Sequence, residues 1–298
     1  MKLFGKRKTV GEFYFFILNT VILSIIGLAM ILPFTHVLAI SLANQVQLAH
    51  SQLILFPNPL HLNFKVYAFI FSRGETFLRP FYNTVFVTVV GTFLDLVLVL
   101  ITAYPLSKSK LKYARPLLLF MFLPMLFNPG IIPRYLVVRS TGLMDSLWAL
   151  IVPSLAGAYG ILLAVNFFRS LPPEIEESAM MDGAGYLTVI TRIVLPLSKP
   201  IMATLAILMS VSYWNILFDA VLFVSSQSRW TLQLMLYQLV AQFATPGAII
   251  NANSIGSMPA PEQIRMTAVI VTTLPILVLY AFCQKYLVRG ITVAAVKG

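Results

Sequence analysis

Long apolar stretches separated by short polar segments are the main pattern of this chain. A helix needs about 20 apolar residues to cross the roughly 30 Å hydrocarbon core of a bilayer. Six stretches meet that length, and they cover residues 13–41, 82–106, 116–138, 146–168, 199–224 and 267–288. The segments of about 10 alternating residues that are typical of membrane barrels are not found. The pattern therefore predicts an all-α polytopic membrane protein with six transmembrane helices.

Composition supports a membrane protein and argues against a nucleic-acid binder. Of the 298 residues, 59% are hydrophobic and 10% are charged, and the mean hydropathy is +0.87. The net charge of +11 would suit nucleic acid, but such a protein gathers its Lys and Arg on one aqueous face. Here the predicted spans separate the basic residues, so we expect a lipid bilayer and no nucleic acid as partner.

The amino terminus resembles a secretory signal only superficially. Lys2, Lys6, Arg7 and Lys8 precede an apolar run that continues to about Leu42. This run is too long for the apolar part of a signal peptide, and no convincing cleavage site follows it. We therefore expect a retained first span. The single cysteine, Cys283, excludes an intrachain disulfide framework and any multi-cysteine metal site.

The basic residues also predict the orientation. With both termini in the cytoplasm, 14 of the 21 Lys and Arg lie on the inner side, as the positive-inside rule favours. The predicted parts are a cytoplasmic segment at 1–12, a six-span transmembrane domain at 13–288 with external segments at 42–81 and 225–266 and a cytoplasmic insert at 170–198, and a cytoplasmic tail at 289–298.

The two external segments carry different patterns. The first contains Phe56-Pro-Asn-Pro59, which predicts a turn or extended structure, followed by a short amphipathic stretch at 64–71. The second begins with Trp230 to Leu239, which predicts a helix on the outer surface, and continues as a polar linker.

The insert at 170–198 has the signals of a two-part helical elbow. Ser170 is a candidate cap for a helix that begins near Pro172 and Pro173, because proline suits the first helical turn. Acidic residues follow in the opening turns, where the helix dipole favours them. Gly183 can take a positive φ and end this helix. Residues 187–195 then predict a second short helix that stops at Pro196.

The spacing within the insert resembles the EAA signature of ABC-importer membrane subunits. The sequence has Glu177-Ser-Ala179, three residues, Gly183, nine residues, and Ile193-Val-Leu-Pro196. Ser178 replaces the alanine that the family usually has. Other stretches look like the carbohydrate-uptake permeases, in the branch of lipo-oligosaccharide and polysaccharide importers. They include Ala103-Tyr-Pro-Leu-Ser107, Gly130-Ile-Ile-Pro-Arg-Tyr135, Leu195-Pro-Leu-Ser-Lys-Pro200 and Trp214-Asn215.

The resemblance implies a fold, a location, partners and a coupling site. The location is the bacterial cytoplasmic membrane, and the transmembrane part at 13–288 is the permease domain. It implies the type I ABC-importer permease fold, a homologous permease partner, two ATPase subunits that bind ATP and Mg, and an extracytoplasmic solute-binding protein. No Gly-x4-Gly-Lys-Ser/Thr loop occurs here, so this chain is not the hydrolase and we expect it to bind no cofactor. The residues that the resemblance assigns to ATPase coupling are Glu177, Ser178, Ala179, Asp182, Gly183, Ile193, Leu195 and Pro196.

Polar residues within the predicted spans are candidates for a substrate path. Asp219 follows Trp214 and Asn215 by about one helical turn, so these three residues could share a face. Tyr213 is the fourth candidate. Aromatic faces with amide and carboxylate groups suit sugars, although hydrogen bonding between helices would use the same residues. For Asp95 we expect an ion pair or a hydrogen bond between spans. The histidines at 36, 50 and 61 have no metal-ligand spacing.

Two other classes of function stay open. A secondary transporter would need coupling carboxylates at the midplane and inverted repeats, whereas only two acids lie deep and no repeat is visible. A membrane-bound scaffold or sensor would have no ATPase partner. The resemblance favours an ATP-driven sugar importer, but an importer of a non-sugar solute would have the same signature. The identity and length of the sugar are not encoded in any pattern found here.

Overall fold

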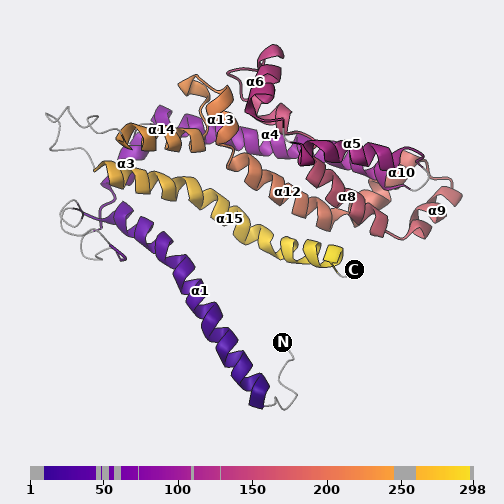
Figure 1. Ribbon diagram of the computed structural model, residues 1–298, viewed down its shortest axis with the longest axis horizontal. Coiled ribbons are helices and arrows are strands. Elements are labelled where there is room, and N and C mark those ends of the chain that lie inside the picture. The colour runs from indigo at the N-terminus through magenta and orange to yellow at the C-terminus, as the bar shows by residue number, and fades with distance from the viewer. Residues whose placement is uncertain are drawn as a thin grey trace. The chain divides into compact units, whose positions relative to one another are not determined.

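All regular elements of the described part of the chain are helical. The structure, a computed structural model, describes residues 10–44, 48, 54–56, 62–72, 74–108, 111–127, 129–244 and 260–295 (Figure 1). The longer α-helices are α1 (Val10–Leu42), α3 (Lys65–Ser72), α4 (Gly74–Ser107), α5 (Ala114–Leu126), α6 (Ile131–Ser140), α8 (Ala158–Ser170), α9 (Pro173–Met181), α12 (Lys199–Trp214), α14 (Leu232–Ala244) and α15 (Pro261–Ala295). The shorter helical pieces are α7 (Trp148–Ile151), η1 (Val152–Ser154), α10 (Tyr186–Val189), η2 (Ile190–Val194), α11 (Leu195–Leu197), α13 (Phe218–Phe223) and η3 (Gln227–Arg229).

The chain folds as two units, which are treated separately. One unit comprises Met1–Ser72 and Gln242–Val271, and the other comprises Arg73–Ala241 and Thr272–Gly298. The smaller unit is held by polar contacts around the end of α1. There the Gln263 amide donates to the Ala43 carbonyl oxygen at 2.6 Å, and the Ser41 and Tyr67 hydroxyls lie 2.9 Å apart.

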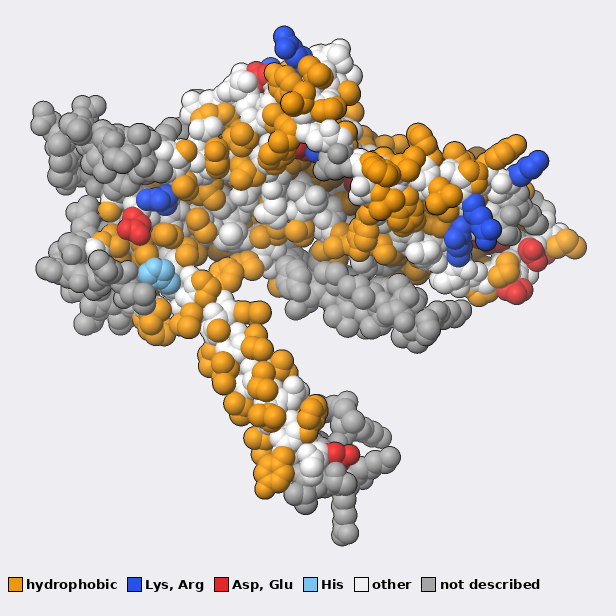
Figure 2. Space-filling model, in the orientation of Figure 1, with side chains coloured by type: hydrophobic (Ala, Val, Ile, Leu, Met, Phe, Trp, Pro, Cys, Tyr) orange, Lys and Arg blue, Asp and Glu red, His pale blue; other side chains and the backbone are white. Residues whose placement is uncertain are grey.

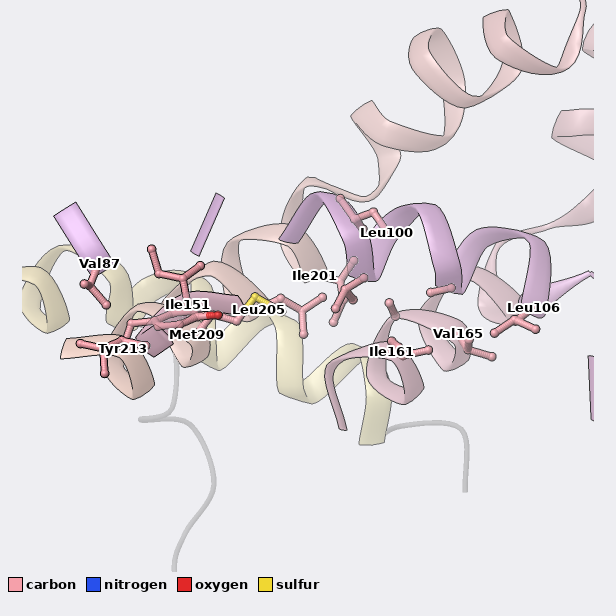
Figure 3. Packing of buried hydrophobic residues seen from close by; sticks show 14 of the residues in the cluster. Val87, Leu100, Leu106, Ile151, Ile161, Val165, Ile201, Leu205, Met209 and Tyr213 are labelled. Carbon is pink, nitrogen blue, oxygen red and sulfur yellow. The ribbon is translucent and has the colours of Figure 1, made fainter. Parts of the chain in front are cut away.

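The larger unit is built around α4. This helix packs along both α8 and α12, and the three run beside one another in Figure 1. Their facing side chains form one apolar core, which Figure 3 shows from close by. Its members include Val99 of α4, Ile161 of α8 and Leu205 of α12, all 1% exposed or less. The core fixes these helices to one another, so residues at the two ends of the bundle keep fixed positions relative to each other.

Two helices are long and apolar enough to cross a membrane by themselves. They are Gly11–Leu42 and Phe77–Ser107, close to the first two predicted spans. Three further pairs of described helices pass the same test only as bent units: Ala114–Leu126 with Ile131–Ser140 at 113°, Trp148–Ser154 with Ala158–Ser170 at 48°, and Tyr186–Leu197 with Lys199–Trp214 at 74°. The described residues therefore give between two and five candidate spans.

The breaks differ from the uninterrupted helices expected at 116–138, 146–168 and 199–224. The first stretch divides into α5 and α6, and Gly130 precedes α6 with φ +82°. The second contains Ala156, which has φ +57°, between η1 and α8. The third ends as a helix at Trp214 and resumes at Phe218. A residue with positive φ lies at each of the first two breaks, whereas the third has no such residue. All three breaks fall within apolar runs, so hydropathy alone does not reveal them.

The helix expected at 230–239 is confirmed, because α14 covers most of that stretch. The amphipathic stretch at 64–71, for which no secondary structure was predicted, corresponds to α3. Residues 57–59 of the expected turn and residues 245–259 of the expected linker lie outside the described part of the chain.

Candidate functional site

The insert at 170–198 folds as the expected two-part elbow, at the end of the larger unit opposite α14 (Figure 1). Its first arm is α9, which begins at Pro173 with Pro172 as the preceding residue. The expected capping role of Ser170 is wrong. Ser170 is the last residue of α8, and its hydroxyl donates to the Phe167 carbonyl oxygen at 2.7 Å. Proline at the first helical position makes such a cap less necessary, since it has no N–H to satisfy.

Gly183 ends α9 with φ +85°, which confirms the expected conformation. The amide of Gly183 donates to the Met180 carbonyl oxygen, and the amide of Ala184 donates to that of Ala179, both at 3.0 Å. This pair of bonds is the Schellman motif, which places a left-handed residue, usually glycine, directly after the helix. The turn therefore has a fixed direction, and the second arm leaves it at a defined angle.

The second arm is longer than expected. Residues Tyr186–Leu197 form one helical run in which α10, a π-helical turn at Ile190–Val194 and α11 follow directly. Pro196 does not stop this run, because proline is compatible with the first turn of α11. The run ends one residue later, at Leu197, before the bend into α12. Val189 and Val194 are buried in the apolar core and anchor the arm.

The coupling candidates divide into an outward set and an inward set. Glu177, Ser178, Asp182, Gly183 and Pro196 are exposed. Ala179 and Leu195 are half-buried and pack against the core, and Ile193 is also half-buried. In Figure 2, acidic and basic side chains gather at the end of the unit where α9 lies, next to a largely hydrophobic surface.

Three large apolar side chains at the elbow were not singled out from the sequence. Met181, Leu187 and Tyr186 are 89%, 78% and 71% exposed. They flank the Gly183 turn on both sides, beside Asp182. Exposed apolar groups rimmed by polar ones mark interaction sites. The signal was present in the sequence, because large apolar residues stand on both sides of Gly183 in a segment that was expected to face the cytoplasm.

Of the four path candidates, Tyr213 and Trp214 are packing residues in this conformation. Both are buried, at 3% and 4% exposure. The indole N–H of Trp214 donates to the Thr272 carbonyl oxygen at 3.2 Å, and its ring meets that of Phe81 edge-on. The Tyr213 ring lies directly against Gly91 of α4, where a Cβ would come within 2.9 Å of it.

Asn215 and Asp219 do not share a helix face, because α12 ends at Trp214. Asn215 is exposed, and its side-chain oxygen accepts a hydrogen bond from Gln233 at 3.3 Å. Asp219 lies in α13 and is buried. Its carboxylate pairs with Arg134 of α6, with 2.7 Å between Oδ2 and Nη2. The ion pair neutralises a carboxylate that would be costly at membrane depth.

Asp95 makes the expected hydrogen bond between spans. Its Oδ1 accepts from the backbone amide of Ala156 at 2.8 Å, at the break between η1 and α8. A helix break leaves amides without partners inside the apolar region, and each unpaired amide there is costly. Asp95 supplies the partner from α4.

Another acid, Asp145, was not predicted to have any role. It lies between α6 and α7 with φ +54°, and its Oδ1 accepts from the amides of Ser225 and Ser226 at 3.0 and 2.9 Å. It also pairs with Arg229 at 3.3 Å. The Ser226 hydroxyl and amide bonds, followed by the Ser225 amide and Arg229, hold the pKa of Asp145 below its ordinary value. This network fastens the segment after α13 to the segment before α7.

No group of three or more His, Cys, Asp or Glu in the described residues could hold a metal ion. His36 contacts the Ile54 carbonyl oxygen through Nδ1 at 2.8 Å, so its ring has a structural partner. His50 and His61 lie outside the described residues.

Comparison with known proteins assigns the family. A polygalacturonan/rhamnogalacturonan transport system permease protein of Bacillus subtilis, YtcP, is 37% identical and the match covers 91% of this chain and 94% of that protein. Protein LplC of the same organism is 39% identical, with 95% of each chain covered. The chain belongs to the carbohydrate ABC-importer permeases. No family model matches it.

A solved structure supports the same family at the level of the fold. It is the crystal structure of a bacterial ABC transporter involved in the import of the acidic polysaccharide alginate. One of its chains aligns with a TM-score of 0.86 and 26% identity, over 95% of this permease and 99% of that chain. The helical fold is thus that of an ABC-importer permease. This protein is a membrane transport subunit like its relatives, and its long apolar helices are consistent with that.

Proposed function

We propose that this permease forms the translocation path of an ATP-driven oligosaccharide importer together with a second, related permease. In this proposal the chain crosses the membrane six times and both termini are cytoplasmic. Two ATPase subunits bind on the cytoplasmic side and an extracytoplasmic binding protein delivers the sugar. The observation that carries the proposal is the elbow: a rigid turn at Gly183 that presents acidic and apolar side chains at one end of the apolar bundle.

The elbow is the proposed ATPase dock. A helix seated in a groove of a partner moves as a rigid body, whereas a flexible loop would absorb the displacement. Glu177 and Asp182 supply charge, and the strongly exposed Met181 and Leu187 supply apolar area. Aromatic residues and Met are enriched in interfaces between proteins, which suits Met181 and Tyr186. ATP binding would then close the ATPase dimer and displace the elbow, switching the cavity between outward and inward access.

A matched pair of variants tests the dock. Met181→Glu places a charge at an apolar contact, so the ATPase subunit should no longer co-purify with the permeases. Ile175→Glu makes the same change in the same helix at a residue that is 40% exposed. It lies six residues away and therefore on another side of α9, so co-purification should persist. Equal recovery of the ATPase with both variants would contradict the proposed dock.

Among the path candidates we propose that Asn215 contacts the sugar. It is exposed at the break between α12 and α13, whereas Tyr213, Trp214 and Asp219 are buried. Its side-chain amide donates to the Val211 carbonyl oxygen at 2.9 Å, which holds its position. An amide at a helix break offers both a donor and an acceptor to hydroxyl groups. Asn215→Ala should change which oligosaccharides stimulate ATP hydrolysis. Asn166→Ala, at an exposed position of α8, is the control, and an identical change in both variants would remove Asn215 from the path.

The cargo is proposed by analogy with relatives that are named for polysaccharides. YtcP is named for polygalacturonan and rhamnogalacturonan, and the structurally similar transporter imports alginate. We therefore expect oligosaccharide fragments of polysaccharides as cargo. Proteoliposomes that contain the complete transporter measure the uptake of labelled fragments. Uptake should require ATP on the side of the membrane where the ATPase subunits lie. Uptake without ATP that collapses with the proton gradient would instead indicate a secondary transporter.

A further inference from the structure

Glu176 is the one acidic residue of α9 that the structure turns inward. Its neighbours Glu174 and Glu177 are exposed, whereas the Glu176 side chain is 12% exposed. Its two carboxylate oxygens lie 2.5 and 2.6 Å from Nζ of Lys108, the residue directly after α4. The Tyr104 hydroxyl donates to the same carboxylate at 3.1 Å. One carboxylate thus joins the first arm of the elbow to the last turn of α4.

The partners of Glu176 are themselves held in place. The Lys108 ammonium lies 4.4 Å from the centre of the Tyr104 ring, a cation–π contact. The Tyr104 ring meets that of Phe168 edge-on at 5.7 Å, and Phe168 is buried in the core. Arg169 donates to the Leu106 carbonyl oxygen at 3.4 Å. The receiving end of the contact is therefore part of the packed bundle.

This polar contact is important because α9 has little apolar anchorage of its own. No residue of α9 is buried. The second arm differs, because Val189 and Val194 are fully packed in the core. A helix that lies on a bundle without buried side chains can slide or lift when it is pulled. A charged, partly buried and bidentate contact resists both movements, and salt screens it less than a surface pair.

We propose that Glu176, Lys108 and Tyr104 form a strut that makes α9 and the Ser107 end of α4 move together. Because α4 packs along both α8 and α12, a displacement of α9 then reaches the centre of the bundle directly, as well as through the second arm. This inference rests on the proposed function, in which the ATPase docks on α9. Glu176 and Lys108 are positioning residues: they contact neither nucleotide nor sugar, and they act through α4.

The complete transporter, purified with its partner permease and ATPase subunits, provides the test. Glu176→Gln and Lys108→Met should still assemble and hydrolyse ATP, but transport about fivefold less sugar per ATP, the lower range of measured coupling between sites. The swap of Glu176→Lys with Lys108→Glu should recover most of the loss, since the charges again pair. Glu174→Gln is the matched control on the exposed side of α9 and should keep the ratio of the unaltered transporter. A wild-type ratio of sugar transported to ATP hydrolysed in both single variants would overturn the strut. So would a double variant whose ratio is no higher than that of the single variants.

A distance measurement tests the strut independently of sugar uptake. Spin labels at Ile101→Cys on α4 and Glu174→Cys on α9, in a Cys283→Ala background, report the separation of the two helices. The strut requires the same narrow distance without nucleotide and with trapped ATP. A change between the two states would refute it, even if the single variants fail to assemble. If the unaltered complex does not take up any sugar while this distance stays fixed, the proposed function fails and the strut stands.

Discussion

Replacing Gly183 tests the proposed mechanism at the point where backbone conformation alone matters. Gly183 has φ +85°, and a Cβ built on it would meet no atom within 4 Å. The cost of Gly183→Ala is therefore backbone strain without a clash. For an L-residue this strain is about 1–2 kcal/mol, and asparagine adopts the left-handed conformation more easily than alanine. A β-branched residue such as valine is worse still.

The strain converts into a loss of ATPase binding. If only the Schellman turn presents Glu177 and Met181 together, a cost of about 1–2 kcal/mol weakens binding by about fivefold to thirtyfold. Binding of the purified ATPase subunit to the permease pair in lipid nanodiscs measures this directly. We expect the order Gly183, Asn, Ala, Val from tightest to weakest. Sugar uptake should fall in the same order, while insertion into the membrane is unchanged.

Gly185 provides the control within the same turn. A Cβ there also meets no atom within 4 Å, but its φ of −72° is ordinary for any residue. Gly185→Ala should therefore leave ATPase binding and uptake near those of the unaltered protein. If Gly183→Ala and Gly185→Ala behave alike in both assays, the left-handed turn does not carry the coupling and the reasoning is wrong.

Three further changes test the packing around the helix breaks. Gly91→Val should destabilise the protein by about 1–3 kcal/mol, because its Cβ would lie 2.9 Å from the Tyr213 ring. A melting temperature that falls in this variant and rises again when Tyr213→Leu is added would confirm the clash. Ala156→Gly should stabilise the protein by up to about 1 kcal/mol, since glycine adopts φ +57° without strain and keeps the hydrogen bond from its backbone amide to Asp95. An unchanged or lower melting temperature would contradict this. The folded-state pKa of Asp145 is lowered, so its contribution is complete at neutral pH and is lost as pH falls below about 4. The gap in melting temperature between the unaltered protein and Asp145→Asn should be constant above pH 5 and narrow in acid, and a gap that widens in acid would be inconsistent with the network.

Sequence patterns predicted the features that depend on local chemistry. The length of an apolar run sets the length of a helix, so α1 and α4 lie close to the expected spans. The elbow followed from single residues with strong backbone preferences: Pro173 begins α9, and Gly183 ends it with a positive φ. The capping role of Ser170 failed because a hydroxyl can bond back into its own helix as readily as it caps the next one.

Features that depend on contacts distant in the sequence were not predictable. The exposed residue Asn215 and the buried residue Asp219 lie four positions apart, and nothing local reports that one helix ends just before Asn215 and the next begins at Phe218. Glu176 and Glu177 are identical neighbours in the sequence. Only the packing of α9 turns one toward Lys108 and leaves the other exposed. The family signature identified the exposed Glu177, whereas only the structure shows the contacts of Glu176.

The acids within the bundle show why a substrate path is hard to infer from residue type. Asp95 accepts the amide of Ala156 where one apolar run breaks, and Asp219 pairs with Arg134 beside the break after α12. Broken helices leave polar backbone groups inside an apolar region, and those groups need partners of the kind that would also bind a sugar. A carboxylate at membrane depth therefore indicates either a path or a helix break. In this permease the two acids hold breaks, and the polar group left exposed beside them, Asn215, becomes the candidate for contact with the sugar.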